Sequence, residues 1–83
     1  MRCYRWDHEG GTTYVAGKTE EKAALWLPPD ATGLVEVSPE EMASIPVQDG
    51  LPYLAILLGS TLLEKFQFRS RDGIGGILYE EKR

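Results

Sequence analysis

The sequence is poor in cysteine and has no long apolar run. Cys3 is the one cysteine in 83 residues, which excludes an internal disulfide and a cysteine-rich zinc site. The longest apolar run, residues 51–58, is far shorter than the ~20 residues that a membrane-spanning helix needs. Residues 1–11 contain no apolar stretch of the kind that signal peptides carry. We therefore expect a soluble cytoplasmic protein without a membrane partner.

Positive charge is missing from the middle of the chain. Residues 23–64 contain no Lys or Arg, although the whole chain has 9 of them against 13 acids. The same window carries a net charge of −6, while the whole chain carries −4, so the two ends together carry +2. Its acids are Asp30, Glu36, Glu40, Glu41, Asp49 and Glu64. Such a region repels phosphate and attracts basic surfaces, so it is either a solubilising face or a binding surface.

Signatures of catalysis, metal binding and nucleotide binding are also missing. His8 is the only histidine, and its neighbours Asp7 and Glu9 point in different directions in a strand or turn, so they do not converge on one ion. The glycines of residues 73–76 lack the Gly-Lys-Ser/Thr ending of a phosphate-binding loop and lead into a predicted strand. Cys3 has no assignable orienting group for nucleophilic catalysis. We expect no enzymatic activity, no cofactor and no bound metal.

What is present is typical of one small globular domain. Hydrophobic residues make up 42% of the chain and charged residues 27%, which is ordinary for a folded protein. A single domain over residues 1–83 is near the lower size limit for a self-sufficient core. The sequence leaves the oligomeric state open, a homodimer included.

The first half of the chain predicts short strands and one helix. Residues 2–6 and 12–16, rich in aromatic and β-branched side chains, predict two strands joined by the turn residues DHEGG. Thr19 can cap a helix over residues 20–26, which ends before the Pro-Pro pair. Residues 33–37, GLVEV, predict a third strand.

The stretch VSPEEMASIP predicts a short capped helix. Ser38 at the N-cap, Pro39 at the first helical position and Glu41 two residues later match a capping box. Pro46 discourages continuation of the helix. A helix this short is marginal alone, so contacts with the core must stabilise it, and Glu40 is expected to point to solvent.

Two segments of the second half can be interpreted from their periodicity. The spacing of leucine and alanine in residues 51–58 favours a buried helix, and a strand paired to the following segment is the alternative. Residues 63–71, LEKFQFRSR, alternate strictly and predict a strand that buries its phenylalanines and exposes its cations. These cations are Lys65, Arg69 and Arg71.

Residues 77–81, after the turn DGIGG, predict the last strand. The resulting order of elements is β-β-α-β-α-α-β-β. It predicts an α+β fold with an antiparallel β-sheet and short helices packed on one face.

The charge pattern favours a small acidic protein-binding module. We expect its carboxylates to contact a basic protein surface, which speeds encounter, and Trp26 to supply an apolar anchor. The alternative for Trp26 is that it closes the core. The expected partner-binding residues are Glu20, Glu21, Trp26, Asp30, Glu36, Glu40, Glu41 and Asp49.

A nucleic-acid-binding accessory protein is the second interpretation. It would use Lys65, Arg69 and Arg71, but a strand over these residues separates the cations from the phenylalanines, whereas RNA-binding sheets expose both together. With a net charge of −4, direct binding of nucleic acid is disfavoured. A structural or adaptor subunit is the third interpretation.

The short, acidic, cysteine-poor chain, with the β-β-α-β start "TTYVAGKTEEKAALW" and a C-terminal hairpin, resembles small phage-borne inhibitors, the anti-CRISPR proteins among them. The resemblance is one of size and character over the whole chain. Anti-CRISPR proteins commonly bind effector subunits and block guide, target or nuclease sites. The resemblance therefore implies an inhibitor that occupies a basic surface of a nucleic-acid-handling effector complex, with the acidic window as its contact.

Overall fold

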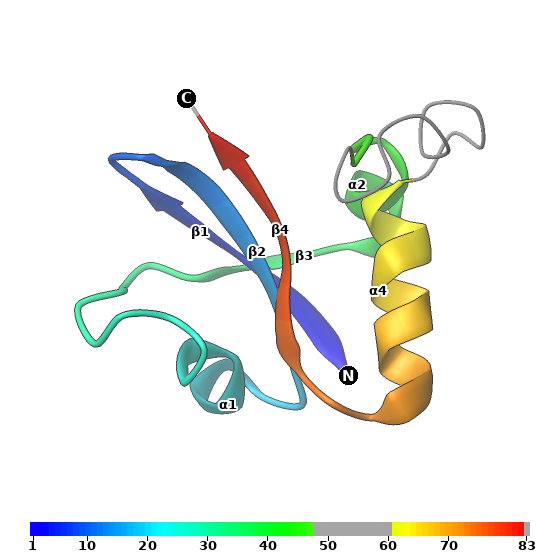
Figure 1. Ribbon diagram of the computed structural model, residues 1–83, viewed down its shortest axis with the longest axis horizontal. Helices are drawn as coiled ribbons and strands as arrows, with labels where there is room; N and C mark the ends of the chain where they lie inside the picture. Colours follow the sequence, from blue (N-terminus) through cyan, green and yellow to red (C-terminus); the bar gives the residue numbers. More distant parts are fainter. Residues whose placement is uncertain (48–60, 83) are drawn as a thin grey trace.

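A four-stranded antiparallel sheet forms the centre of the molecule (Figure 1). The computed structural model describes residues 1–47 and 61–82. The strands are β1 (Arg2–His8), β2 (Gly11–Gly17), β3 (Val35–Val37) and β4 (Gly76–Lys82), in the spatial order β3-β1-β2-β4. The predicted α+β class and antiparallel sheet are confirmed.

The β1–β2 hairpin closes more tightly than the sequence predicted. Its strands pair up to His8 and Gly11, so the turn consists of Glu9 and Gly10 alone. The His8 ring supports this turn, because Nδ1 accepts a hydrogen bond from the Gly10 N–H at 3.2 Å and Nε2 lies 2.9 Å from Thr13 Oγ1. Both ring nitrogens of His8 are therefore engaged in the hairpin.

Strand β2 is buried on both of its faces. Tyr14, Val15 and Ala16 are each at most 5% exposed, although neighbouring residues of a strand point to opposite sides. Tyr14 and Ala16 belong to one hydrophobic core, and Val15 belongs to a second core that also contains Tyr4. The sheet thus separates two cores.

Helices cover both faces of the sheet. The described helices are α1 (Glu20–Ala24), α2 (Pro39–Ala43) and α4 (Leu62–Asp72). Figure 1 shows α1 on one side of the sheet and α2 with α4 on the other. Ala23 of α1 lies in the core with Val15, whereas Met42 of α2 and Leu62 of α4 lie in the core with Tyr14. The sequence had predicted helices on one face, but the continuous apolar run of β2 is the pattern of a strand covered on both sides.

Residues 62–72 form the helix α4, so the predicted strand over residues 63–71 was wrong. Thr61 caps this helix, because its Oγ1 accepts a hydrogen bond from the Glu64 N–H at 3.4 Å. Gly73, in the left-handed conformation with φ of 67°, ends it.

The alternation of residues in this segment predicted a strand, but apolar residues at the spacing of a helix face were also present. Leu62 is fully buried, and Leu63 and Phe66 pack against the same core, which is the i, i+4 pattern of a helix face. Phe68 points outward and is 69% exposed. Leu, Glu, Lys, Gln and Arg, which fill most of the segment, also favour helix over strand.

The remaining elements follow the sequence with changed bounds, and the strands predicted over residues 2–6, 12–16 and 77–81 are each longer than expected. The Thr19 and Ser38 caps are both present, with their hydroxyl oxygens accepting from the N–H groups of Lys22 and Glu41 at 3.2 Å. The helix predicted to reach residue 26 ends at Ala24, and the third strand has three residues. The prediction for residues 51–58 lies outside the described residues. None of the helices that the structure describes is long and apolar enough to cross a membrane.

Candidate functional site

The end of α1 leaves two large apolar side chains in solvent. After Ala24 the chain continues in turns, with the Trp26 N–H bonded to the Ala23 carbonyl at 3.1 Å and the Leu27 N–H to the Ala24 carbonyl at 3.0 Å. Ala23 and Leu27 point inward and are buried. Leu25 and Trp26 therefore point outward, and they are 83% and 51% exposed.

Trp26 borders a hollow of about 360 Å³ between α1 and the loop that precedes β4. The residues that line this hollow are Gly17, Lys18, Lys22, Leu25, Trp26, Gly73 and Gly75. A Cβ atom on Gly75 would lie 3.2 Å from Trp26 Nε1 and 2.5 Å from the Ala16 carbonyl oxygen, so only glycine lets the loop pass this close. Ile74, between two of these lining glycines, is 60% exposed and adds to the apolar area.

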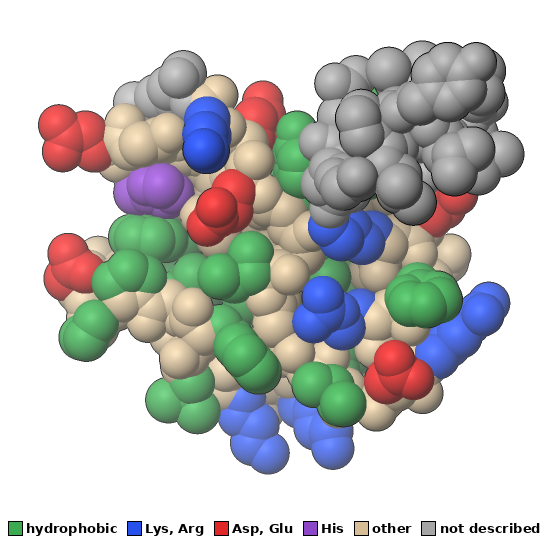
Figure 2. All heavy atoms as spheres, viewed as in Figure 1, with side chains coloured by type: hydrophobic (Ala, Val, Ile, Leu, Met, Phe, Trp, Pro, Cys, Tyr) green, Lys and Arg blue, Asp and Glu red, His purple; other side chains and the backbone are tan. Residues whose placement is uncertain are grey.

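The charged residues that line the hollow are both lysines. Among residues 1–47 and 61–82, neither Lys18 nor Lys22 has a carboxylate oxygen within 4.0 Å of its ammonium group. Figure 2 shows Lys and Arg side chains at this lower end of the molecule, next to hydrophobic side chains. We call Lys18, Lys22, Leu25, Trp26 and Ile74 the Trp26 surface.

The carboxylates expected to bind a partner are spread over several segments. Glu20 and Glu21 lie in the first turn of α1, Asp30 in the loop after it, Glu36 on β3, and Glu40 and Glu41 on α2, while Asp49 lies outside the described residues. Trp26 is on the surface with lysines rather than with these acids. The acids therefore do not surround the expected anchor.

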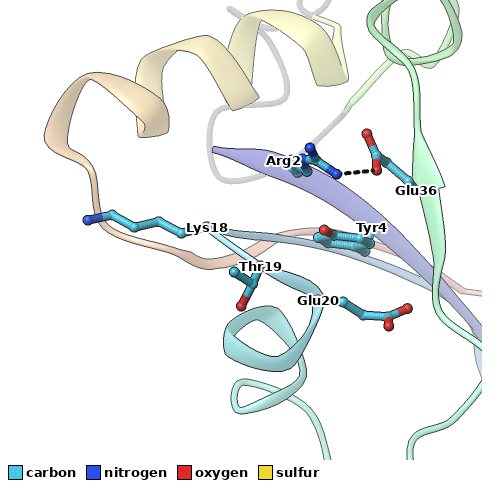
Figure 3. A pocket seen from close by; sticks show the side chains of 6 residues that line it. All are labelled: Arg2, Tyr4, Lys18, Thr19, Glu20 and Glu36. Atoms are coloured by element: carbon cyan, nitrogen blue, oxygen red, sulfur yellow. Dashed lines mark hydrogen bonds and ion pairs between the residues drawn. The ribbon is translucent and has the colours of Figure 1, made fainter.

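Two of the acids meet at a second hollow, of about 510 Å³. Its lining residues are Arg2, Tyr4, Lys18, Thr19, Glu20 and Glu36. Figure 3 shows Tyr4 at the centre, with Arg2 and Glu36 on one side and Glu20 on the other. Arg2 Nη1 lies 3.2 Å from Glu36 Oε1, so this carboxylate is already paired with a cation of β1.

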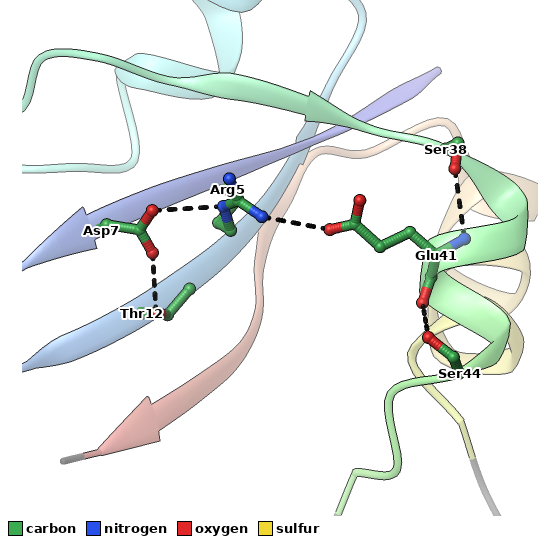
Figure 4. Close-up of polar contacts among 6 residues, drawn as sticks. All are labelled: Arg5, Asp7, Thr12, Ser38, Glu41 and Ser44. Atoms are coloured by element: carbon green, nitrogen blue, oxygen red, sulfur yellow. Dashed lines mark hydrogen bonds and ion pairs between the residues drawn. The ribbon is translucent and has the colours of Figure 1, made fainter.

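Glu41 also contacts an arginine of β1. Its Oε2 atom lies 3.2 Å from Arg5 Nη1, and Arg5 Nε lies 3.3 Å from Asp7 Oδ2 (Figure 4). The predicted capping box is therefore half present: the Ser38 hydroxyl caps α2, but the Glu41 carboxylate contacts Arg5.

These ion pairs could not be read from the sequence window. The arginines lie 34 and 36 positions before their partners, and the antiparallel pairing of β1 with β3 brings them together. Within the described part of the chain, no ion pair involves Glu20, Glu21, Asp30 or Glu40. The window of residues 23–64 is therefore partly neutralised in the fold.

Helix α4 places an exposed aromatic ring among cations. Phe68 is three residues from both Lys65 and Arg71, a spacing that makes neighbours on a helix surface. Burial, and then the nearby Arg69 guanidinium, lower the pKa of Lys65. The expected separation of phenylalanines from cations thus applies to Phe66, which packs on the core, and does not apply to Phe68.

The lone cysteine is a core residue on β1. Cys3 is 1% exposed, and burial, followed by the negative charge of Glu41, raises the pKa of its thiol to about 12. A thiol that stays protonated at neutral pH is a poor nucleophile. Among the described residues no group of three His, Cys, Asp or Glu side chains is placed to hold a metal ion.

No family model, curated protein or solved structure matches this chain. The candidate site therefore rests on its geometry.

Proposed function

We propose that this protein is a small protein-binding module and that the Trp26 surface is its main contact. The proposal rests on the exposure of Trp26 and Leu25, which lie side by side at the rim of a hollow. Neighbouring apolar side chains left in water favour association, and tryptophan is enriched among residues that dominate binding energies. Ala23 and Leu27, buried beneath them, hold both side chains on a fixed backbone.

An inhibitor of a nucleic-acid-handling complex is the more specific form of this proposal. In that form the unpaired carboxylates of α1 and α2 face a basic surface, as the resemblance to anti-CRISPR proteins implies. Glu40 supports it best, since the Ser38 cap and the buried Met42 fix the helix that carries it. The Trp26 surface takes precedence because Glu36 and Glu41 are already paired.

The test is a comparison of variants in photo-crosslinking from a native extract. A diazirine-bearing residue replaces Leu25 in one sample and Phe68 in a control sample, since both side chains are strongly exposed. We expect a protein that crosslinks at residue 25, not at residue 68, and that is lost when Trp26 is changed to Ala. Equal crosslinking at both positions, or crosslinking that persists in Trp26→Ala, would contradict the proposed contact.

Binding of single-stranded nucleic acid is the second candidate function, and the exposure of Phe68 among cations favours it. Aromatic rings on which bases stack, together with cations that contact phosphates, are the usual means of such binding. Fluorescence anisotropy with a labelled oligonucleotide at low salt tests it. Binding should weaken in Phe68→Ala and in Arg71→Ala, and an absence of binding at low salt removes this candidate.

A further inference from the structure

We propose that the Trp26 surface binds an acidic peptide segment that carries an apolar side chain. This inference rests on the proposed function and names the chemistry of its partner. It differs from the expectation of a basic partner, because the charges beside the anchor are of the opposite sign.

The first step is the sign of the charge. The protein carries a net charge of −4, yet the charged residues that line this hollow are Lys18 and Lys22. In the described chain no carboxylate pairs with either of them. A basic partner would meet like charge here, whereas an acidic partner supplies the carboxylates that these lysines lack.

The second step is the arrangement of apolar and charged groups. Leu25 and Trp26 lie on the same rim as the lysines, and Ile74 follows the lining residue Gly73. A ligand that fills the hollow therefore meets an apolar wall and a cation together. The volume of about 360 Å³ is at the lower end of the range for ligand pockets. It suits one large apolar side chain flanked by carboxylates.

The third step is the choice of a peptide over other anions. Nucleic acid presents a phosphate at every nucleotide, and its affinity comes from many cations along the backbone. A membrane surface likewise needs a cluster of basic residues to hold an anionic leaflet. Two lysines beside one hollow match a short segment with few carboxylates. Of the glycines that line the hollow, Gly73 leaves its side of the loop open to an extended chain, because a Cβ atom there would have no atom within 4 Å.

The experiment uses the intact protein and three synthetic hexapeptides. The first alternates aspartate with leucine and phenylalanine, the second has asparagine in place of aspartate, and the third has lysine. NMR follows the indole N–H signals of Trp26 and Trp6; Trp6 is partly buried against the second core and serves as an internal reference. The aspartate peptide should shift the Trp26 signal with about tenfold higher affinity than the asparagine peptide.

Matched variants assign the effect to the lysines. Lys18→Gln and Lys22→Gln should each weaken the aspartate peptide several-fold, whereas Lys82→Gln, at the far end of β4, should leave its affinity unchanged. All three changes remove one positive charge. Circular dichroism confirms that each variant remains folded.

Several outcomes would overturn the inference. Equal or tighter binding of the asparagine or lysine peptide would show that the partner is not acidic, while leaving Trp26 as a protein contact. A lysine-dependent shift caused instead by a single-stranded oligonucleotide or by anionic lipid vesicles would assign the surface to another class of partner. If none of the peptides shifts the Trp26 signal, the peptide site is rejected. The crosslinking at residue 25 tests the proposed function separately.

Discussion

Arg5 and Glu41 meet at 3.2 Å between β1 and α2, and Arg5 also contacts Asp7 at 3.3 Å on its own strand. Arg2, nearer the N-terminus of β1, pairs with Glu36, and its side chain is more exposed than that of Arg5. The Arg5 contact ties the capped helix to the sheet. It therefore gives the carboxylate of Glu41 a structural contact within the domain.

Removing the charge of Glu41 should lower stability slightly. Glu41→Gln loses the ion pair with Arg5, and because the pair is partly exposed we expect a loss of less than about 1 kcal/mol in the free energy of unfolding. Glu36→Gln, which breaks the more exposed pair with Arg2, should cost less. Urea denaturation of both variants measures the difference. Equal losses would mean that the Arg5 contact contributes no more than an ordinary surface pair.

The orientation of α4 predicts very different costs for two substitutions. Leu62→Ala removes a fully buried side chain and should cost about 2–5 kcal/mol. Phe68→Ala changes an exposed side chain and should cost less than about 0.5 kcal/mol. Thermal or urea denaturation tests this. A large loss in Phe68→Ala would instead support the strand over residues 63–71.

The buried thiol of Cys3 should make the protein less stable in alkali. Burial raises its pKa from 9.0 to about 12, so above pH 9 the unfolded chain releases a proton that the folded chain keeps. The contribution of Cys3 to stability is therefore complete below pH 9 and declines as the pH rises towards 12. Unfolding measured from pH 7 to 11 in the native protein and in Cys3→Ala isolates this contribution. Parallel curves for the two proteins would contradict it, as would rapid labelling of the folded thiol at pH 8.

A side chain at residue 75 should disturb Trp26. Gly75→Ala places a Cβ 2.5 Å from the Ala16 carbonyl oxygen and 3.2 Å from Trp26 Nε1, so we expect a cost of about 1–3 kcal/mol and a shifted Trp26 indole signal. Gly33→Ala is the control, because its φ of 74° also strains the backbone but no atom lies within 4 Å. The control should lower stability without moving the indole signal. An unchanged Trp26 signal in Gly75→Ala would mean that the loop and Trp26 are not in contact.

Local signals in the sequence predicted local structure well. Residues within a few positions of one another determine the caps at Thr19 and Ser38. They also determine the two strands that flank the turn of Glu9 and Gly10. Thr61 carried the same kind of cap signal before α4, but the alternation after it also fitted a strand. Single-sequence periodicity does not distinguish these cases when both faces of the pattern contain apolar residues.

The candidate site was harder to predict because charge in a fold is set by distant neighbours. Trp26 was expected either to supply an apolar anchor or to close the core, and its side chain is half exposed just after the end of α1. The cations beside it, Lys18 and Lys22, precede the window of residues 23–64, which contains no Lys or Arg. From the sequence alone they were not associated with the anchor. Charge along the chain therefore gave no guide to charge around the tryptophan.

The two cores share a backbone, since Tyr14 faces one and its neighbour Val15 faces the other. Because each core contains a residue of β2, this strand cannot leave one core without leaving both. The domain should consequently melt as one cooperative unit, with amide protons of β2 exchanging only through complete opening of the molecule.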